Sequence, residues 1–307
     1  MTGQLDYFSK LRGRIEDRLS ELMPSVPSDR LQEAVRHSLL APAKRVRAVL
    51  VMIAARELGG REENALDPAC SLEMIHAASL ILDDLPAMDD AATRRGLPTN
   101  HRVFGEATAI LAAVGLLNQS YGVAASSETL SREQRLAAVE VLHWAVGLDG
   151  LVRGQQEDLA DSREIMTQAE LEHMYARKTG ALFAAAAECG AIVAQKPVLR
   201  KAMRRFGLDL GVGFQILDDV LDARSTSDRA GKDVDQDTGR TTFASLLGVD
   251  RAAALARTRI EGALVKACLS AKMAGGNGEL FTAFAARLAG AFTELMPEFA
   301  AAVAATG

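Results

Sequence analysis

Two clusters of aspartates, each placed directly after an apolar helical run, constrain this chain more than any other feature. The first cluster is Asp83-Asp84 followed by Asp89-Asp90, with no Lys or Arg between the pairs. Two carboxylates about 4 Å apart repel by roughly 4 kcal/mol at an effective dielectric constant of 20. A hard cation would relieve that repulsion, and a site with few protein ligands suits Mg²⁺ carrying substrate phosphates. The alternative is a solvated acidic turn.

The second cluster repeats this arrangement later in the chain. Asp218-Asp219 and Asp222 follow the apolar run that begins at Gly213. On a helix with about 3.6 residues per turn, Asp218 and Asp222 share one face. Two such clusters in one chain predict the two sides of a site for a polyanion. The alternative is that both clusters are solvent-exposed surface charges that bind no ligand.

Together these motifs resemble those of the trans-isoprenyl diphosphate synthases. The first cluster, continued by Arg94-Arg95-Gly96, is similar to the longer form of that family's first aspartate-rich motif. The second cluster is similar to the family's Asp-Asp-x-x-Asp motif. The resemblance covers about residues 41–248. Within the family, residues 41–47 and 76–83 most resemble bacterial geranylgeranyl diphosphate synthases of carotenoid pathways.

Composition favours an all-α protein, because aliphatic residues and Ala dominate and no run alternates like an exposed strand. The resemblance implies one domain over residues 1–307, a large helical bundle of the isoprenoid synthase type with a central active-site cavity. Pro24 should end a first amphipathic helix, and Ser28 should cap the second. Pro86 should interrupt regular helix directly after the first aspartate pair.

Charge and cysteine content exclude several other classes of function. A net charge of −5, with no basic stripe or tail, argues against general nucleic-acid binding. Cys70, Cys189 and Cys268 are odd in number and far apart, which fits a reducing cytoplasm and no disulfide framework. The uncharged stretch Ala107 to Ser127 is long enough to span a bilayer, but polar residues 118–121 interrupt it. We expect a buried central helix and no membrane span.

A cluster of cations, Lys44, Arg45 and Arg47, opens another apolar run. Alone it could be a solvated helix edge. Near a Mg²⁺ site, Lys44 and Arg47 become candidate diphosphate ligands, because Arg offers a fork matched to phosphate oxygens and Lys a point charge. The family's Gly-Gly-Lys-Arg-x-Arg-Pro stretch is altered here, with Pro-Ala in place of the glycines and Ala48 in place of the proline.

The resemblance also implies a role for each polar residue of the motifs. The metal ligands would be Asp83, Asp84, Asp89, Asp218 and Asp222. The residues that bind substrate would be Lys44, Arg47, His76, Arg94, Arg95, Lys178, Thr179, Gln215, Asp218 and Lys232, and those with a catalytic role would be Asp83, Asp89, Asp218, Lys178 and Lys232. Without this precedent, His76 would be an ordinary core histidine and Lys178 a surface charge. Residues 154–159 are similar to the family's Gly-Gln-x-x-Asp-Leu segment, whose role here is undefined.

The implied reaction is head-to-tail 1′-4 prenyl transfer. An allylic diphosphate (dimethylallyl, geranyl or farnesyl) loses its diphosphate, and the double bond of isopentenyl diphosphate attacks the allylic cation. Mg²⁺ and fixed cations would stabilise the leaving group, and an apolar pocket would exclude water. The family is typically homodimeric, so we expect a homodimer.

Product length is expected to depend on the residues just before Asp83. One prenyl unit is about as long as one helical turn of about 5.4 Å. Ala78 is small where bacterial farnesyl diphosphate synthases commonly place an aromatic, and Ser79 is small too. The sequence therefore predicts geranylgeranyl diphosphate as the product, with farnesyl diphosphate as the alternative.

Two rival classes fit parts of the pattern. A terpene cyclase would share the first motif and the helical fold, but it usually carries an Asn/Ser/Glu metal site and more aromatic residues. A non-catalytic subunit of a heteromeric synthase typically loses a metal motif. Both aspartate motifs are present in this chain.

Overall fold

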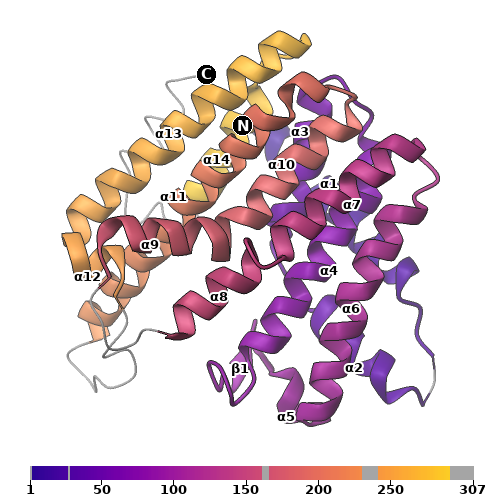
Figure 1. Cartoon of the computed structure of the whole chain (residues 1–307), viewed down its shortest axis with the longest axis vertical. Coiled ribbons are helices and arrows are strands. Elements are labelled where there is room, and N and C mark those ends of the chain that lie inside the picture. Colours follow the sequence, from indigo (N-terminus) through magenta and orange to yellow (C-terminus); the bar gives the residue numbers. More distant parts are fainter. Residues whose placement is uncertain (1, 27, 161–165, 230–240, 291–307) are drawn as a thin grey trace.

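The computed structural model describes residues 2–26, 28–160, 166–229 and 241–290. These residues form helices with one two-stranded hairpin, as Figure 1 shows, and the all-α prediction is confirmed. In chain order the elements are α1 (Thr2–Leu22), α2 (Arg30–Leu39), α3 (Val46–Glu57), η1 (Glu62–Ala65), α4 (Leu66–Asp83), β1 (Thr93–Arg94), β2 (Leu97–Pro98), α5 (Asn100–Phe104), α6 (Glu106–Ser126), α7 (Arg132–Val146), α8 (Leu151–Ala160), α9 (Gln168–Tyr175), η2 (Ala176–Gly180), α10 (Ala181–Val193), η3 (Pro197–Leu199), α11 (Arg200–Arg229), α12 (Phe243–Leu247), α13 (Val249–Ala274) and α14 (Glu279–Gly290).

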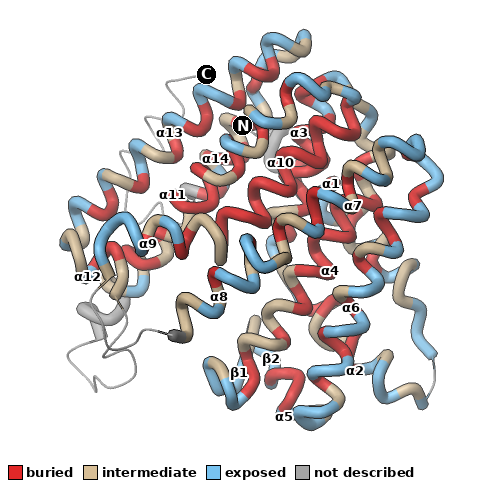
Figure 2. The backbone as a smooth tube through the Cα atoms, viewed as in Figure 1, coloured by how far each residue is buried: buried red, intermediate tan, exposed pale blue. Residues whose placement is uncertain are grey.

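Helix α10 lies at the centre of the bundle. All of its residues are buried, as expected for a helix that is apolar on every side. Helices α3, α7 and α11 pack against it, and α4 lies between α3 and α6. Figure 2 shows the buried residues concentrated along these central helices. One cluster of buried apolar residues extends from Phe8 to Leu288.

Glycines allow α11 to approach the start of α10 closely. A Cβ atom at Gly211 would lie 2.7 Å from the Cα atom of Gly180, and one at Gly207 would lie 2.3 Å from the carbonyl oxygen of Phe183. No side chain fits in either place without a shift of backbone. This contact sets the position of the second aspartate cluster, on α11, relative to the η2 turn.

The ends of the first helices match the sequence prediction except at one cap. Helix α1 ends at Leu22, just before Pro24. The cap of α2 is Asp29, whose side chain accepts hydrogen bonds from two backbone amides, so the prediction of Ser28 was wrong. Ser28 has a left-handed backbone with a φ of 63° and cannot provide the extended geometry of an N-cap. Asp29 is the stronger competitor because its carboxylate also complements the helix dipole.

Helix α6 is less buried than the sequence indicated. Two stretches, 62–83 and α6, are long and apolar enough to cross a bilayer by composition. The apolar window of the first is 72% buried inside the protein, whereas that of α6 is only 39% buried. One face of α6 packs on α4 and α7, and the opposite face exposes Ile110, Leu111 and Val114. The expectation of a buried central helix therefore holds for one face only.

We predict that Gly211→Ala destabilises the protein by about 1–3 kcal/mol, because the new methyl group overpacks the contact between α11 and η2. Each kcal/mol corresponds to a fall in melting temperature of about 2–4 °C for a chain of this size class. Gly115→Ala in α6 is the matched control, because nothing lies within 4 Å of its Cβ position. Equal melting temperatures for the two variants would contradict the close packing.

Candidate active site

The first aspartate cluster surrounds the end of α4. The helix ends at Asp83, and the following turn returns so that the backbone amide of Asp89 donates a hydrogen bond to the carbonyl oxygen of Asp83 at 2.9 Å. Asp83 is half-buried, while Asp89 is exposed. The turn thus brings together two residues that regular helical geometry would separate, which is the effect expected of Pro86.

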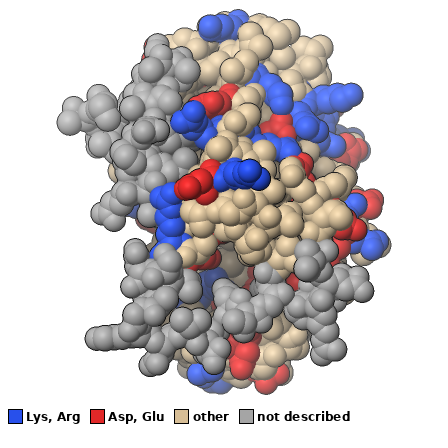
Figure 3. Space-filling model, turned by 90° about the vertical axis from the view of Figure 1, so that its left-hand side faces the viewer, with Lys and Arg blue, Asp and Glu red and all other residues tan. Residues whose placement is uncertain are grey.

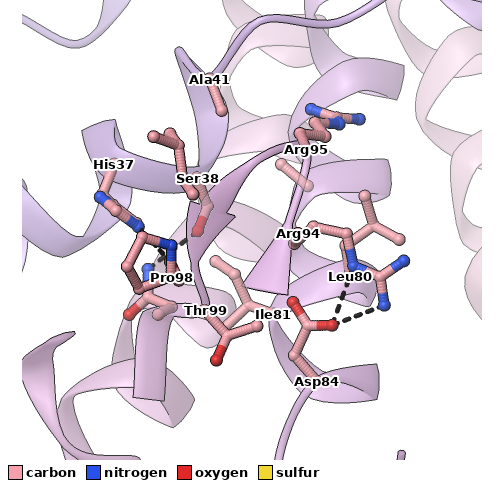
Figure 4. Close-up of a pocket in the computed structure, with 13 residues that line it drawn as sticks. His37, Ser38, Ala41, Leu80, Ile81, Asp84, Arg94, Arg95, Pro98 and Thr99 are labelled. Atoms are coloured by element: carbon pink, nitrogen blue, oxygen red, sulfur yellow. Dashed lines mark hydrogen bonds and ion pairs between the residues drawn. The ribbon is translucent and has the colours of Figure 1, made fainter. Parts of the chain in front are cut away.

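A tight hairpin places two arginines beside this cluster. Strands β1 and β2 are joined by Arg95 and Gly96, both with positive φ (55° and 78°), which is the geometry of a two-residue hairpin turn. Nε and Nη2 of Arg94 both donate to Oδ1 of Asp84, at 2.9 and 2.5 Å (Figure 4). Burial alone would lower the pKa of Arg94, but this hydrogen-bonded pair raises it. Asp84 therefore fixes Arg94 at the edge of the site.

The second cluster divides into one structural and two accessible carboxylates. Asp219 is buried, and its Oδ2 accepts hydrogen bonds from the Tyr175 hydroxyl at 2.7 Å and from the Phe243 amide at 3.0 Å. It therefore joins α9 and α12 to α11. Asp218 is half-buried and Asp222 is exposed one turn further on, so these two share a face of α11.

Both clusters hold carboxylates in positions that disfavour their charged form. Burial, with the charges of Asp222 and Asp219, raises the pKa of Asp218 to about 7. Burial likewise raises the pKa of Asp83 to about 6, against the effect of Lys178 and with that of Asp89. A divalent cation stabilises such carboxylates most, so the donor set fits Mg²⁺. Among the described residues no group of three or more His, Cys, Asp or Glu side chains is arranged to hold a metal by itself. Ligand oxygens would have to complete the coordination.

The π-helical turn η2 lies between α8 and α11 and carries polar residues toward both. Lys178 forms an ion pair with Asp158 of α8, and Oγ1 of Thr179 donates to Oε1 of Gln215 on α11 at 2.8 Å. Such π-turns often occur at functional sites because they widen the helix locally. Three predicted substrate ligands are thus positioned by one irregular turn.

A separate set of cations lies around His76. Nη1 of Arg47 donates to Nε2 of His76 at 3.2 Å. Burial, followed by the charges of Arg47 and Arg95, lowers the pKa of His76 well below its usual range, so the ring is neutral and accepts this bond. Burial lowers the pKa of Arg47 to about 10, which keeps it charged at neutral pH. Lys44 is exposed just before α3. This group has the chemistry of a diphosphate site.

Arg45, the remaining cation of that stretch, has a structural role. Its side chain is almost fully buried, and it pairs with the buried carboxylate of Glu73 at 3.4 Å. It also donates to the carbonyl oxygens of Leu39 and Ala41. Arg45 therefore holds the end of α2 against α4 and leaves Arg47 for the site.

An apolar cavity of about 230 Å³ opens at Asp83. Its walls come from α4, the turn after it, α6, α7 and α8, and consist of Ser79, Leu82, Asp83, Met88, Leu117, Val146, Leu151, Val152, Gln155, Gln156 and Leu159. Ser79 lines this cavity, whereas Ala78 is fully buried and is not among its walls. Its mostly apolar walls, with a few polar side chains among them, are those expected of a site that binds a hydrocarbon chain.

Comparison with known proteins decides the family. The sequence model described as Polyprenyl synthetase matches residues 28–271. The chain belongs to the polyprenyl synthetase family.

Curated and solved members agree with this assignment. The chain is 42% identical over 257 residues to a geranylgeranyl diphosphate synthase of Pseudescherichia vulneris, covering 82% of this chain and 83% of that one. It is 40% identical over 259 residues to a farnesyl diphosphate synthase of Bacillus subtilis, with 82% and 88% covered. The apo structure of an FPP/GFPP synthase from Zymomonas mobilis superposes with a TM-score of 0.80 at 29% identity, covering 92% and 98%. The fold is that of isoprenoid synthases, and the protein is a prenyltransferase.

One predicted residue of this polyprenyl synthetase site cannot be placed, and two residues of the site were not predicted from the sequence. Lys232 falls outside the described residues. The sequence did not single out Tyr175, which holds Asp219, or the role of Asp158 in pairing with Lys178. Asp158 does lie in the segment 154–159 that resembled the family pattern, so that resemblance was the available signal. Tyr175 left no comparable pattern.

We predict that Asp218→Asn stabilises the metal-free protein more at pH 8 than at pH 5. The folded-state pKa of Asp218 is about 7, above its usual value of 3.8, so the native state binds this proton more tightly than the unfolded state. The resulting stability is full below about pH 4 and is lost as the pH rises through about 7. The neutral amide avoids that loss, so in excess chelator the variant should melt about 2 °C above the wild type at pH 8.

The control for this measurement is Asp250→Asn, since the Asp250 side chain is 98% exposed. Its melting temperature should differ from that of the wild type by the same small amount at both pH values. A pH-independent difference for Asp218→Asn would show that its carboxylate is not destabilised by burial.

Proposed function

We propose that this prenyltransferase condenses isopentenyl diphosphate with allylic diphosphates in a Mg²⁺-dependent head-to-tail reaction that ends at geranylgeranyl diphosphate. The observation that carries the proposal is the placement of two half-buried aspartates on separate helices near η2. Asp83 ends α4, where its pKa responds to the charge of Lys178 in η2, and Asp218 lies within α11, which packs against η2. An anion bridged to both through cations explains why each carboxylate is kept where burial opposes its charge.

The allylic diphosphate is assigned to the space between the aspartate clusters. Asp83 and Asp89 on one side and Asp218 and Asp222 on the other would hold Mg²⁺, which when bound supplies positive charge to the leaving diphosphate. Asp84, the fifth aspartate of the predicted ligand set, is instead paired with Arg94 and holds it beside the site. Arg94 and Lys178 add fixed cations from the hairpin and from η2. Lys178 must leave Asp158 to reach a phosphate oxygen, so that ion pair holds the ammonium group close to the site until substrate binds.

Isopentenyl diphosphate is assigned to the cations around His76. Lys44, Arg47 and Arg95 would bind its phosphates, and neutral His76 would hold the Arg47 fork in place. Thr179 and Gln215 orient each other between the two substrates. Positioning the double bond over the developing allylic cation is the main task of this half of the site, because oriented reactants avoid most of the entropy cost of a bimolecular step.

The growing hydrocarbon tail is assigned to the apolar cavity at Asp83. Its walls exclude water, which would otherwise trap the cation. Ser79 is a small wall residue, and the relative from Pseudescherichia vulneris is a geranylgeranyl diphosphate synthase, so both support a twenty-carbon product. The Bacillus subtilis relative is a farnesyl diphosphate synthase of similar identity, which makes farnesyl diphosphate the second candidate.

A homodimer is supported by the uncovered face of α6. This helix has no charged residue after Glu106, and its exposed face carries Ile110, Leu111 and Val114. A second copy would remove this apolar surface from water.

Figure 3 shows Lys and Arg side chains interspersed with Asp and Glu on one face of the molecule, a distribution unlike a nucleic-acid site. The free thiols are compatible with the cytoplasm as the site of action.

The decisive experiment is a product assay. Purified protein, Mg²⁺ and isopentenyl diphosphate are combined with dimethylallyl, geranyl or farnesyl diphosphate, and the dephosphorylated products are identified by mass. We expect a twenty-carbon product from each primer and none with excess chelator. A fifteen-carbon end product would keep the reaction and refute the assigned length. No condensation with any primer would refute the proposed function.

We predict that Ser79→Tyr shortens the product to fifteen carbons, because a phenol ring would fill the cavity next to Asp83. Ala78→Tyr tests the sequence-based assignment of that residue in the same assay, since a ring there must displace core atoms to reach the tail. Consumption of dimethylallyl diphosphate in the first condensation should persist in both variants. An unchanged twenty-carbon product from both would place the floor of the cavity elsewhere.

A further inference from the structure

An aromatic ring faces the guanidinium group of Arg47. The guanidinium carbon lies 4.9 Å from the centre of the Phe183 ring. Phe183 is fully buried on α10, and its ring packs against that of Phe214 on α11, with centres 5.6 Å apart and planes inclined by 41°. A residue of the central helix thus contacts the guanidinium group of Arg47, one of the cations around His76.

Among the described residues, no carboxylate forms an ion pair with Arg47. Nη1 donates to a neutral ring nitrogen of His76, and the buried Nε has no hydrogen-bond partner among the described residues. Glu73 and Asp218 act on Arg47 only through their more distant charges. The neighbouring Arg45, by contrast, is paired directly with Glu73. The partly buried charge of Arg47 is therefore stabilised locally by the face of an aromatic ring.

We propose that Phe183 is a positioning residue for isopentenyl diphosphate, acting through Arg47. This inference rests on the proposed function of the His76 group. A ring face stabilises and orients a planar guanidinium while leaving its N–H groups for phosphate oxygens. A carboxylate in the same place would occupy those N–H groups and repel the diphosphate. Phe214 supports the ring from the side of α11, so the orientation of Arg47 depends on the packing of α10 against α11.

The test is to remove the ring and measure the two substrates separately. In Phe183→Leu, Arg47 loses its platform, so we expect the KM for isopentenyl diphosphate to rise about tenfold while the KM for geranyl diphosphate stays within about twofold. Phe183→Tyr keeps the ring face and should restore most of the affinity. Phe206→Leu is the matched control, because Phe206 is also fully buried and packs on another ring, that of Phe281 at 5.2 Å. It should lower stability and leave both KM values unchanged.

A second replacement separates the electrostatics of the ring from its volume. Pentafluorophenylalanine at position 183 keeps the shape but removes the negative ring face, so it should weaken isopentenyl diphosphate binding as Phe183→Leu does. Binding is measured by titration calorimetry without an allylic substrate. If the wild type binds isopentenyl diphosphate and the fluorinated protein binds it equally well, the role of Phe183 is refuted. If the wild type does not bind it, the proposed function fails instead.

Discussion

Burial of like charges is the constraint on which this structure depends. Asp83 ends α4 and Asp218 lies within α11, and burial raises the pKa of each. A protein can maintain such groups only if something else gains from their charge. The surroundings limit the cost for the neighbouring aspartates, because Arg94 forms an ion pair with Asp84, and Tyr175 and Phe243 donate hydrogen bonds to Asp219. In Asp83-Asp84 and in Asp218-Asp219, one aspartate is thus satisfied by the protein, and the other is left for the proposed site.

The cationic half of the site shows the same division among its positive charges. Arg45 is paired with the buried carboxylate of Glu73 and serves the fold. Arg47, two residues later, contacts neutral His76 and the Phe183 ring and has no ion pair within the described part of the chain. The same division between satisfied and available charges therefore occurs among the aspartates and among the arginines. Helix α10 connects them, because it continues directly from η2 and carries Phe183 in its first turn. The close contact between α10 and α11 at Gly207 fixes the position of Phe183 relative to the aspartates of α11.

Much of this arrangement follows from local sequence, and the rest depends on contacts between distant segments. The end of α4 near Pro86 and the shared face of Asp218 and Asp222 could be predicted, because helix geometry and proline stereochemistry act within a few residues. The exposure of one face of α6 could not, since its apolar composition is the same whether or not a neighbour covers it. The pairing of Phe183 with Arg47 spans helices far apart in the chain, and no spacing in the sequence records it.

The most direct test of the account is a double-mutant cycle on Mg²⁺-dependent binding of geranyl diphosphate, with Asp83→Asn and Asp218→Asn. If both carboxylates hold one metal-bridged diphosphate, each single variant should lose most of the affinity that Mg²⁺ confers. The double variant should then lose little more than either single variant. Losses that add up, or Mg²⁺-dependent affinity that survives in both single variants, would show that α4 and α11 do not hold a common ligand.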